Sequence, residues 1–278
     1  MRALRLALLA LVSPSALLAV PAFAATPLAP HRAVYDLVLD KASDRSGITS
    51  LAGRMVYEFN GSPCEGYTVK FRFVTQIDSG DNSRVTDQQT TTFEDAEGKT
   101  FSFVTKSFVD QNLDKEVKGT ATREDNGLKV AIDKPEKSDL ELSATQFPTQ
   151  HLEELIKKAN SGETFYETNL FDGSEDADKV MTTTVIVGKK TDSDADKSDP
   201  ELPALKTLGK DKYWPVEIAY FDDQSADGGE EVPEYRISFK LHENGLTRDL
   251  MMDYGEFSMT GKLVNLSLFP APKQKCDK

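Results

Sequence analysis

The chain has 278 residues, with 33 basic and 46 acidic side chains and a formal net charge of −13 at pH 7. Such an average field repels polyanions, which argues against nucleic acid as a partner. The chain contains two cysteines and three histidines, which leaves little material for a metal centre.

The N-terminus has the three parts of an export signal. A short basic head is followed by an apolar run over residues 6–19 and by the small-x-small sequence Ala22-Phe23-Ala24. The run is shorter than the roughly 20 residues that a membrane-spanning helix needs. Cleavage between Ala24 and Ala25 is therefore favoured over a membrane anchor. No cysteine lies near the cut, so acylation as a lipoprotein is not expected there.

Alternation of apolar and polar residues dominates the rest of the chain and indicates half-buried strands. The clearest run is Tyr67–Ile77. Similar runs cover residues 51–60, 100–108, 180–187, 214–221 and 235–241. Asn126-Gly127 and Asn244-Gly245 are typical of tight hairpin turns. About a dozen strands are counted in this way, which predicts an all-β antiparallel meander, barrel or sandwich. No linker divides the sequence, so we expect a signal peptide over 1–24 and one domain over 25–278.

One segment has helical periodicity instead. Leu152, Leu155, Ile156 and Ala159 are spaced as on one face of a helix, and Pro148 suits its first turn. Gly162 can supply a left-handed stop. The pattern predicts a short amphipathic helix over about 148–160, whose apolar side covers the open end or the concave face of the sheet. A helix lying on a membrane surface is the alternative, and the narrow stripe argues against it.

The two cysteines, Cys64 and Cys276, form an even and minimal set in an exported chain. In an oxidising compartment such a set predicts one structural disulfide. The alternative is two unpaired thiols, one of them reactive.

Two further segments offer candidate binding residues. Asp192–Asp199 has carboxylates on alternate residues, as calcium loops have, but Lys197 stands where the turn needs glycine. We expect a solvated loop and no metal. Trp214 and Tyr220 lie on one predicted strand. They are interpreted as core packing, with an aromatic wall for an apolar ligand as the functional alternative.

The sequence offers no catalytic constellation. His31, His151 and His242 are isolated in the sequence, and no nucleophile elbow or glycine-rich phosphate loop occurs. We therefore predict that the protein is not an enzyme and uses no cofactor.

Several long blocks of this sequence nevertheless form a familiar pattern. They are HRAVYDLVLDKASDRSGITSLAGRMVYEFNGSPCEGYTVKFRFVTQ, FPTQHLEELIKKANSG, WPVEIAYFD, EYRISFKLHENGLTRDLMMDYGEFSMTGKL and a cysteine near the end. Together they resemble the envelope integrity protein B family, periplasmic proteins of alphaproteobacteria long catalogued as a domain of unknown function. The resemblance runs over essentially the whole chain after the signal.

The resemblance implies a β-spiral, an open barrel-like sheet of about fourteen antiparallel strands with a small helical element. It also implies a disulfide at the positions of Cys64 and Cys276. The implied role is periplasmic, non-enzymatic maintenance of the cell envelope.

Three hypotheses about function follow. In the first, the protein supports the envelope by binding an envelope component or a partner protein. In the second, it is a carrier or sensor that holds a lipid-like ligand inside the curved sheet. The third, a hydrolase of cell wall or lipid, would need a polar constellation that the sequence does not display.

Overall fold

The computed structural model describes residues 27–174, 176–209, 211–222 and 232–270. These residues form fifteen strands, one α-helix and one short 3-10 helix. The elements are β1 (His31–Ala42), β2 (Ser50–Ser62), β3 (Gly66–Ser79), β4 (Asn82–Glu94), β5 (Thr100–Val109), β6 (Asn112–Glu124), β7 (Gly127–Lys134), β8 (Ser138–Leu142), α1 (Pro148–Ser161), β9 (Phe165–Leu170), β10 (Met181–Val187), β11 (Thr191–Asp192), η1 (Ala204–Leu208), β12 (Lys212–Asp222), β13 (Tyr235–His242), β14 (Thr247–Asp253) and β15 (Phe257–Leu268).

All the strands belong to one antiparallel sheet that does not close. Its order is β8-β7-β6-β5-β4-β3-β2-β1-β15-β14-β13-β12-β10-β9, with the two-residue β11 beside β12. Strand β1 pairs with both β2 and β15, so the N-terminal and C-terminal halves form one continuous surface. The two free edges, β8 and β9, are not hydrogen-bonded neighbours within the described residues. The predicted all-β, open antiparallel sheet is thereby confirmed.

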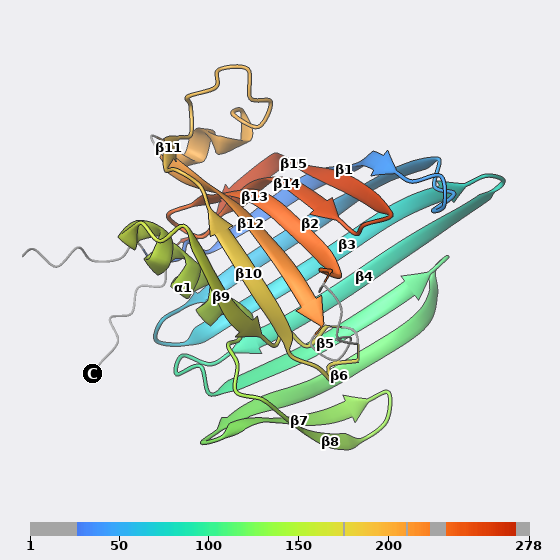
Figure 1. Cartoon of the computed structure of the whole chain (residues 1–278), viewed down its shortest axis with the longest axis vertical. Coiled ribbons are helices and arrows are strands. Elements are labelled where there is room, and N and C mark those ends of the chain that lie inside the picture. Colours follow the sequence, from blue (N-terminus) through green and yellow to red (C-terminus); the bar gives the residue numbers. More distant parts are fainter. Residues whose placement is uncertain (1–26, 175, 210, 223–231, 271–278) are drawn as a thin grey trace, which may run out of the picture.

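The curl of the sheet brings its two halves face to face. Figure 1 shows β9, β10, β12 and β13 crossing in front of the strands β2–β5. One cluster of buried side chains joins these layers, with Phe59 and Tyr67 on the early strands and Val185, Val216 and Ile218 on the late ones. Because side chains alternate along a strand, every second residue of both layers faces this interior.

Helix α1 is anchored at both ends. Pro148 begins it, and Gly162 ends it in the left-handed conformation, with φ of 83°. No local side chain caps its N-terminus. Instead Glu94, at the end of β4, accepts hydrogen bonds from the backbone N–H groups of Thr149, at 2.8 Å, and Gln150, at 3.2 Å. A carboxylate at this end also suits the helix dipole.

The apolar side of α1 packs into the interior. Leu155, Ile156 and Ala159 are buried in the same cluster as Phe59 and Val216. The predicted helix, over about 148–160, is thus confirmed at 148–161. It was predicted to cover the open end or the concave face of the sheet, and its apolar side packs against buried side chains of both layers.

Candidate functional site: an apolar cavity inside the curled sheet

A cavity of about 480 Å³ lies between the two layers and beside α1. This volume falls in the range of about 300–1,000 Å³ that small-molecule sites occupy. The lining comes from β2–β4, α1, β9 and its following residues, and β12–β14. Its residues are Met55, Tyr57, Phe71, Phe73, Gln88, Pro148, His151, Leu152, Leu155, Leu170, Asp172, Ile218, Tyr220, Tyr235, Ile237, Phe239, Gly245, Thr247, Leu250, Met252 and Tyr254.

One wall of the cavity is built by the β2–β3 hairpin. Met55 lies opposite Phe73 in the register, and Tyr57 lies opposite Phe71. These residues are two apart on each strand, so all four point to the same face. Phe71 and Phe73 also stack, with their ring centroids 5.9 Å apart. The hairpin therefore presents a continuous aromatic surface to the interior.

The facing wall comes from three late strands. Ile218 on β12 lies opposite Ile237 on β13, and Ile237 lies opposite Met252 on β14. Phe239, two residues beyond Ile237, extends the wall toward Val216. The two walls were encoded far apart in the sequence and meet only because the sheet curls.

Several of these apolar side chains are only partly buried although they face inward. They are Tyr57, Phe71, Phe73, Ile237 and Phe239. Apolar surface in contact with water costs roughly 25 cal/mol per Å² relative to burial. An apolar ligand in the cavity would cover this surface, and the hydrophobic effect would then favour its binding.

Few polar groups reach the cavity, and most of them are uncharged. Burial lowers the pKa of His151 to about 4, so its imidazole is neutral at neutral pH. Burial also raises the pKa of Tyr57 to about 12. Asp172 is the one acidic residue among the described lining residues, and no lysine or arginine is among them.

A row of tyrosines crosses one end of the cavity. Tyr220 and Tyr235 are opposite each other on β12 and β13 and stack at 4.3 Å with an interplanar angle of 17°. Tyr254, directly after β14, lies 6.0 Å from Tyr235. Burial raises the pKa of each of the three phenols, so all remain protonated at neutral pH. Each can donate one hydrogen bond and accept others.

The structure places the two candidate wall residues differently. Tyr220 lines the cavity. Trp214 is 2% exposed and packs in the core beside α1, outside the cavity lining. Lys190 lies over its indole ring, 4.4 Å from the centroid. The sequence shows that both residues share a strand, but it does not show which of them a ligand could reach.

Of the other predicted site residues, Cys64 alone is among the residues that the structure describes. Cys64 lies in the turn between β2 and β3. Cys276 and the predicted cleavage residues Ala24 and Ala25 fall outside the described residues. The Cys64–Cys276 disulfide therefore stays a prediction. Among the described residues, no helix is long and apolar enough to cross a membrane.

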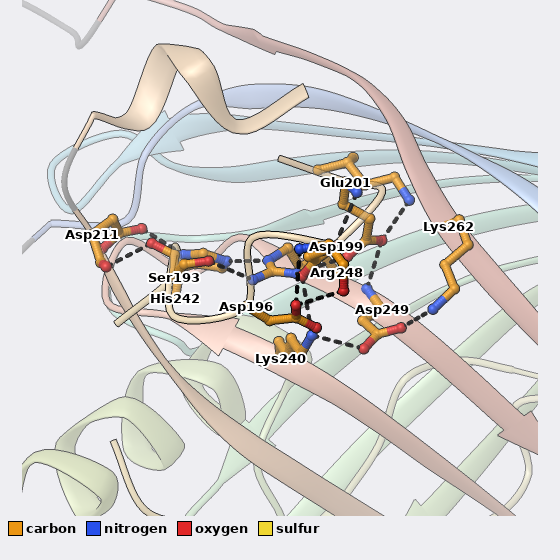
Figure 2. A network of polar contacts seen from close by, with 12 residues as sticks. Ser193, Asp196, Asp199, Glu201, Asp211, Lys240, His242, Arg248, Asp249 and Lys262 are labelled. Atoms are coloured by element: carbon orange, nitrogen blue, oxygen red, sulfur yellow. Dashed lines mark hydrogen bonds and ion pairs between the residues drawn. The ribbon is translucent and has the colours of Figure 1, made fainter. Parts of the chain in front are cut away.

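A second polar feature is a buried charge network around Arg248 (Figure 2). Arg248, Asp199 and Glu201 are not among the lining residues of the cavity. Arg248 on β14 is fully buried. Its Nη1 bonds Asp199 at 2.6 Å and Glu201 at 2.9 Å, and its Nε donates to His242 Nε2 at 3.0 Å. Since that ring nitrogen accepts, the imidazole proton is assigned to Nδ1, which donates to Asp211.

This network fastens the segment between β11 and β12 to the sheet. Glu201 also accepts hydrogen bonds from the backbone N–H groups of Asp249, at 2.9 Å, and Leu263, at 2.7 Å. Burial works against ionisation of Asp199, but the Glu201 N–H and the guanidinium outweigh it and hold the pKa of Asp199 below its usual range. The expected solvated loop is thus only partly solvated: Asp194 and Asp196 are exposed, whereas Asp199 is ion-paired.

The charged side chains of the network are paired with one another. Arg248, Glu201 and His242 are each at most 1% exposed, and each already has polar partners. Within the described residues, no group of three or more His, Cys, Asp or Glu side chains is arranged to hold a metal ion. The network is therefore a structural element, and the cavity is the candidate site.

An open, barrel-like antiparallel sheet with an apolar interior defines the class of this protein. A family model described as EipB-like matches residues 22–270. The cell envelope integrity protein EipB of Brucella abortus (strain 2308) is 57% identical over 258 residues, which cover 92% of this chain and 90% of that protein. The chain therefore belongs to the EipB-like family.

A solved structure agrees with this assignment. The crystal structure of a beta-barrel-like protein of a domain of unknown function from Brucella abortus has a TM-score of 0.83 and 56% sequence identity to this chain. The match covers 88% of this chain and 100% of that one. The resemblance inferred from the sequence blocks is confirmed.

Proposed function

We propose that this protein is an exported periplasmic factor that maintains cell-envelope integrity by holding an apolar, lipid-like ligand in the cavity. The observation that carries the proposal is the partly buried apolar lining of an interior cavity of about 480 Å³. The envelope role is supported by the name of the Brucella relative, a cell envelope integrity protein 57% identical to this chain. Export is supported by the N-terminal signal pattern.

The ligand would be held by contact between its apolar surface and the apolar walls of the cavity. The aromatic wall of β2 and β3 and the aliphatic wall of β12–β14 present apolar surface from two sides, while α1 closes the space beside them. A chain-like molecule between these walls would remove apolar surface of both partners from water. The protein would keep such a molecule soluble in an aqueous compartment, either to carry it or to sense it.

A binding role without catalysis is consistent with the distribution of charge. The polar residues of the cavity lining are mostly neutral at neutral pH, and the buried charge network is paired within itself. We propose accordingly that the protein is not an enzyme. We also propose that residues 25–278 form one domain, since the family model matches residues 22–270 without a break.

Complementation with a filled cavity tests the proposal. Ile237→Trp adds an indole to a partly buried, cavity-facing position, whereas Ile186→Trp adds one to an isoleucine on β10 that is 50% exposed and outside the lining. Both variants are expressed in a strain that lacks the gene, and the strain is challenged with bile salt. We expect Ile186→Trp to restore resistance and Ile237→Trp to fail at equal periplasmic levels and similar melting temperature. Full rescue by a folded Ile237→Trp would contradict the proposal.

A further inference from the structure

Three tyrosines and the one acidic residue of the described lining lie toward one end of the cavity. Tyr220 ends the inward-facing row of β12, Tyr235 begins that of β13, and Tyr254 follows β14. Asp172, two residues after β9, lines the same cavity. After burial, the charge of Asp172 contributes to the raised pKa values of both Tyr220 and Tyr235, which places this carboxylate close to their hydroxyls.

The carboxylate of Asp172 can accept further hydrogen bonds. One oxygen accepts a hydrogen bond from the backbone N–H of Ser174 at 2.9 Å. Among the described residues, no ion pair involves Asp172, and its second oxygen has no hydrogen-bond partner. Lys179 is the described lysine nearest to it in sequence, and it is ion-paired with Asp222 at 2.9 Å and Glu234 at 3.2 Å.

Among the described lining residues, Asp172 therefore brings a negative charge to this end of the cavity, and no lysine or arginine accompanies it. The phenols around it are neutral, and their oxygens can accept hydrogen bonds. A positive group of a ligand would gain a charge-assisted hydrogen bond to the carboxylate, and such bonds are stronger than those between neutral groups. A negative group would meet repulsion from Asp172 without a cation to offset it.

We propose that the ligand is an amphiphile with a positively charged amine or quaternary ammonium group, held by Asp172 beside Tyr220 and Tyr235, with its apolar chain between the two walls. This inference rests on the proposed function, since it names the chemical class of the molecule in the same cavity.

Three probes with the same twelve-carbon chain test the inference. The mature protein is titrated by calorimetry at pH 8, below the micelle concentrations, with dodecyltrimethylammonium, neutral dodecyldimethylamine oxide and dodecanoate. Each probe that binds should do so with a stoichiometry of one molecule per chain. The cation should bind roughly tenfold more tightly than the neutral probe, and the anion should bind most weakly.

Two matched variants separate this site from the general attraction of an acidic protein for cations. Asp172→Asn removes the carboxylate at the cavity, and Asp139→Asn removes one exposed carboxylate on β8, outside the lining. Asp172→Asn should bring the cation to the affinity of the neutral probe, whereas Asp139→Asn should leave the preference unchanged.

The possible outcomes test the cationic group of the ligand and the proposed apolar-ligand function separately. Equal or stronger binding of the neutral or anionic probe would refute the cationic group and leave the apolar-ligand function standing. Equal losses in the two variants would also refute it, because the preference would then come from net charge alone. Failure of all three probes to bind would refute the proposed function and the inference with it.

Discussion

Replacement of Arg248 by methionine tests whether the charge network holds the late strands together. The change leaves the buried carboxylate of Glu201, which is 1% exposed, without its cationic partner, and it removes the donor to His242. Removal of one partner of a buried ion pair costs roughly 3–5 kcal/mol. For a domain of this size about 1 kcal/mol corresponds to ~2–4 °C, so we expect the melting temperature to fall by about 6–20 °C.

The assay is calorimetric unfolding of the mature protein, together with two companion variants. Lys262→Met removes one of the two lysines paired with Asp249, in a pair whose side chains are 43% and 30% exposed, and such a pair contributes about 0–1 kcal/mol. The double change Arg248→Met with Glu201→Gln should recover part of the loss, because the uncompensated charge is gone. The reasoning is refuted if Arg248→Met costs no more than Lys262→Met.

Three further predictions concern His151, the cysteines and Glu94. Because burial lowers the pKa of His151 to about 4, the unfolded chain binds a proton at this residue at higher pH than the folded protein does. The free energy of unfolding should therefore fall by up to ~3 kcal/mol from pH 7 to pH 4, and His151→Gln should make it less dependent on pH in urea melts. Cys64→Ser should cost about 2–4 kcal/mol, and reductant should lower the melting temperature of the parent alone, whereas a parent indifferent to reductant would contradict the Cys64–Cys276 pair. Glu94→Ala removes the cap of α1 at Thr149 and should cost about 1–2 kcal/mol, which hydrogen exchange of the helix amides should report as faster exchange in its first turn.

Local patterns in the sequence predicted the elements well. The Tyr67–Ile77 alternation lies within β3, at Gly66–Ser79, because a half-buried strand needs one apolar face. Asn244-Gly245 lies in the turn between β13 and β14, with Gly245 at φ of 87°. A tight turn also joins β6 to β7, but it consists of Asp125-Asn126, one residue before the predicted pair, and Gly127 begins β7. The helix was predictable because Pro148 and Gly162 mark both of its ends.

Features that depend on the curl of the sheet were not predictable. The alternation in β2 and β3 indicates which side chains face inward. It does not show that Phe71 and Phe73 are only partly buried and line a cavity together with Ile237. Their spacing of two residues was the available signal. The bond between Arg248 and Glu201 joins residues that are 47 positions apart, with β12 and β13 between them, and no sequence spacing encodes it.

The cavity as a ligand site is the central claim, and native mass spectrometry tests it most directly. The mature protein is isolated from the periplasm without detergent, in parallel with Ile237→Trp and Ile186→Trp. We predict that the parent and Ile186→Trp retain an added mass that organic solvent releases as an apolar molecule, and that Ile237→Trp does not. A parent that carries no such molecule, and that takes up none when incubated with an envelope lipid extract, would contradict the account.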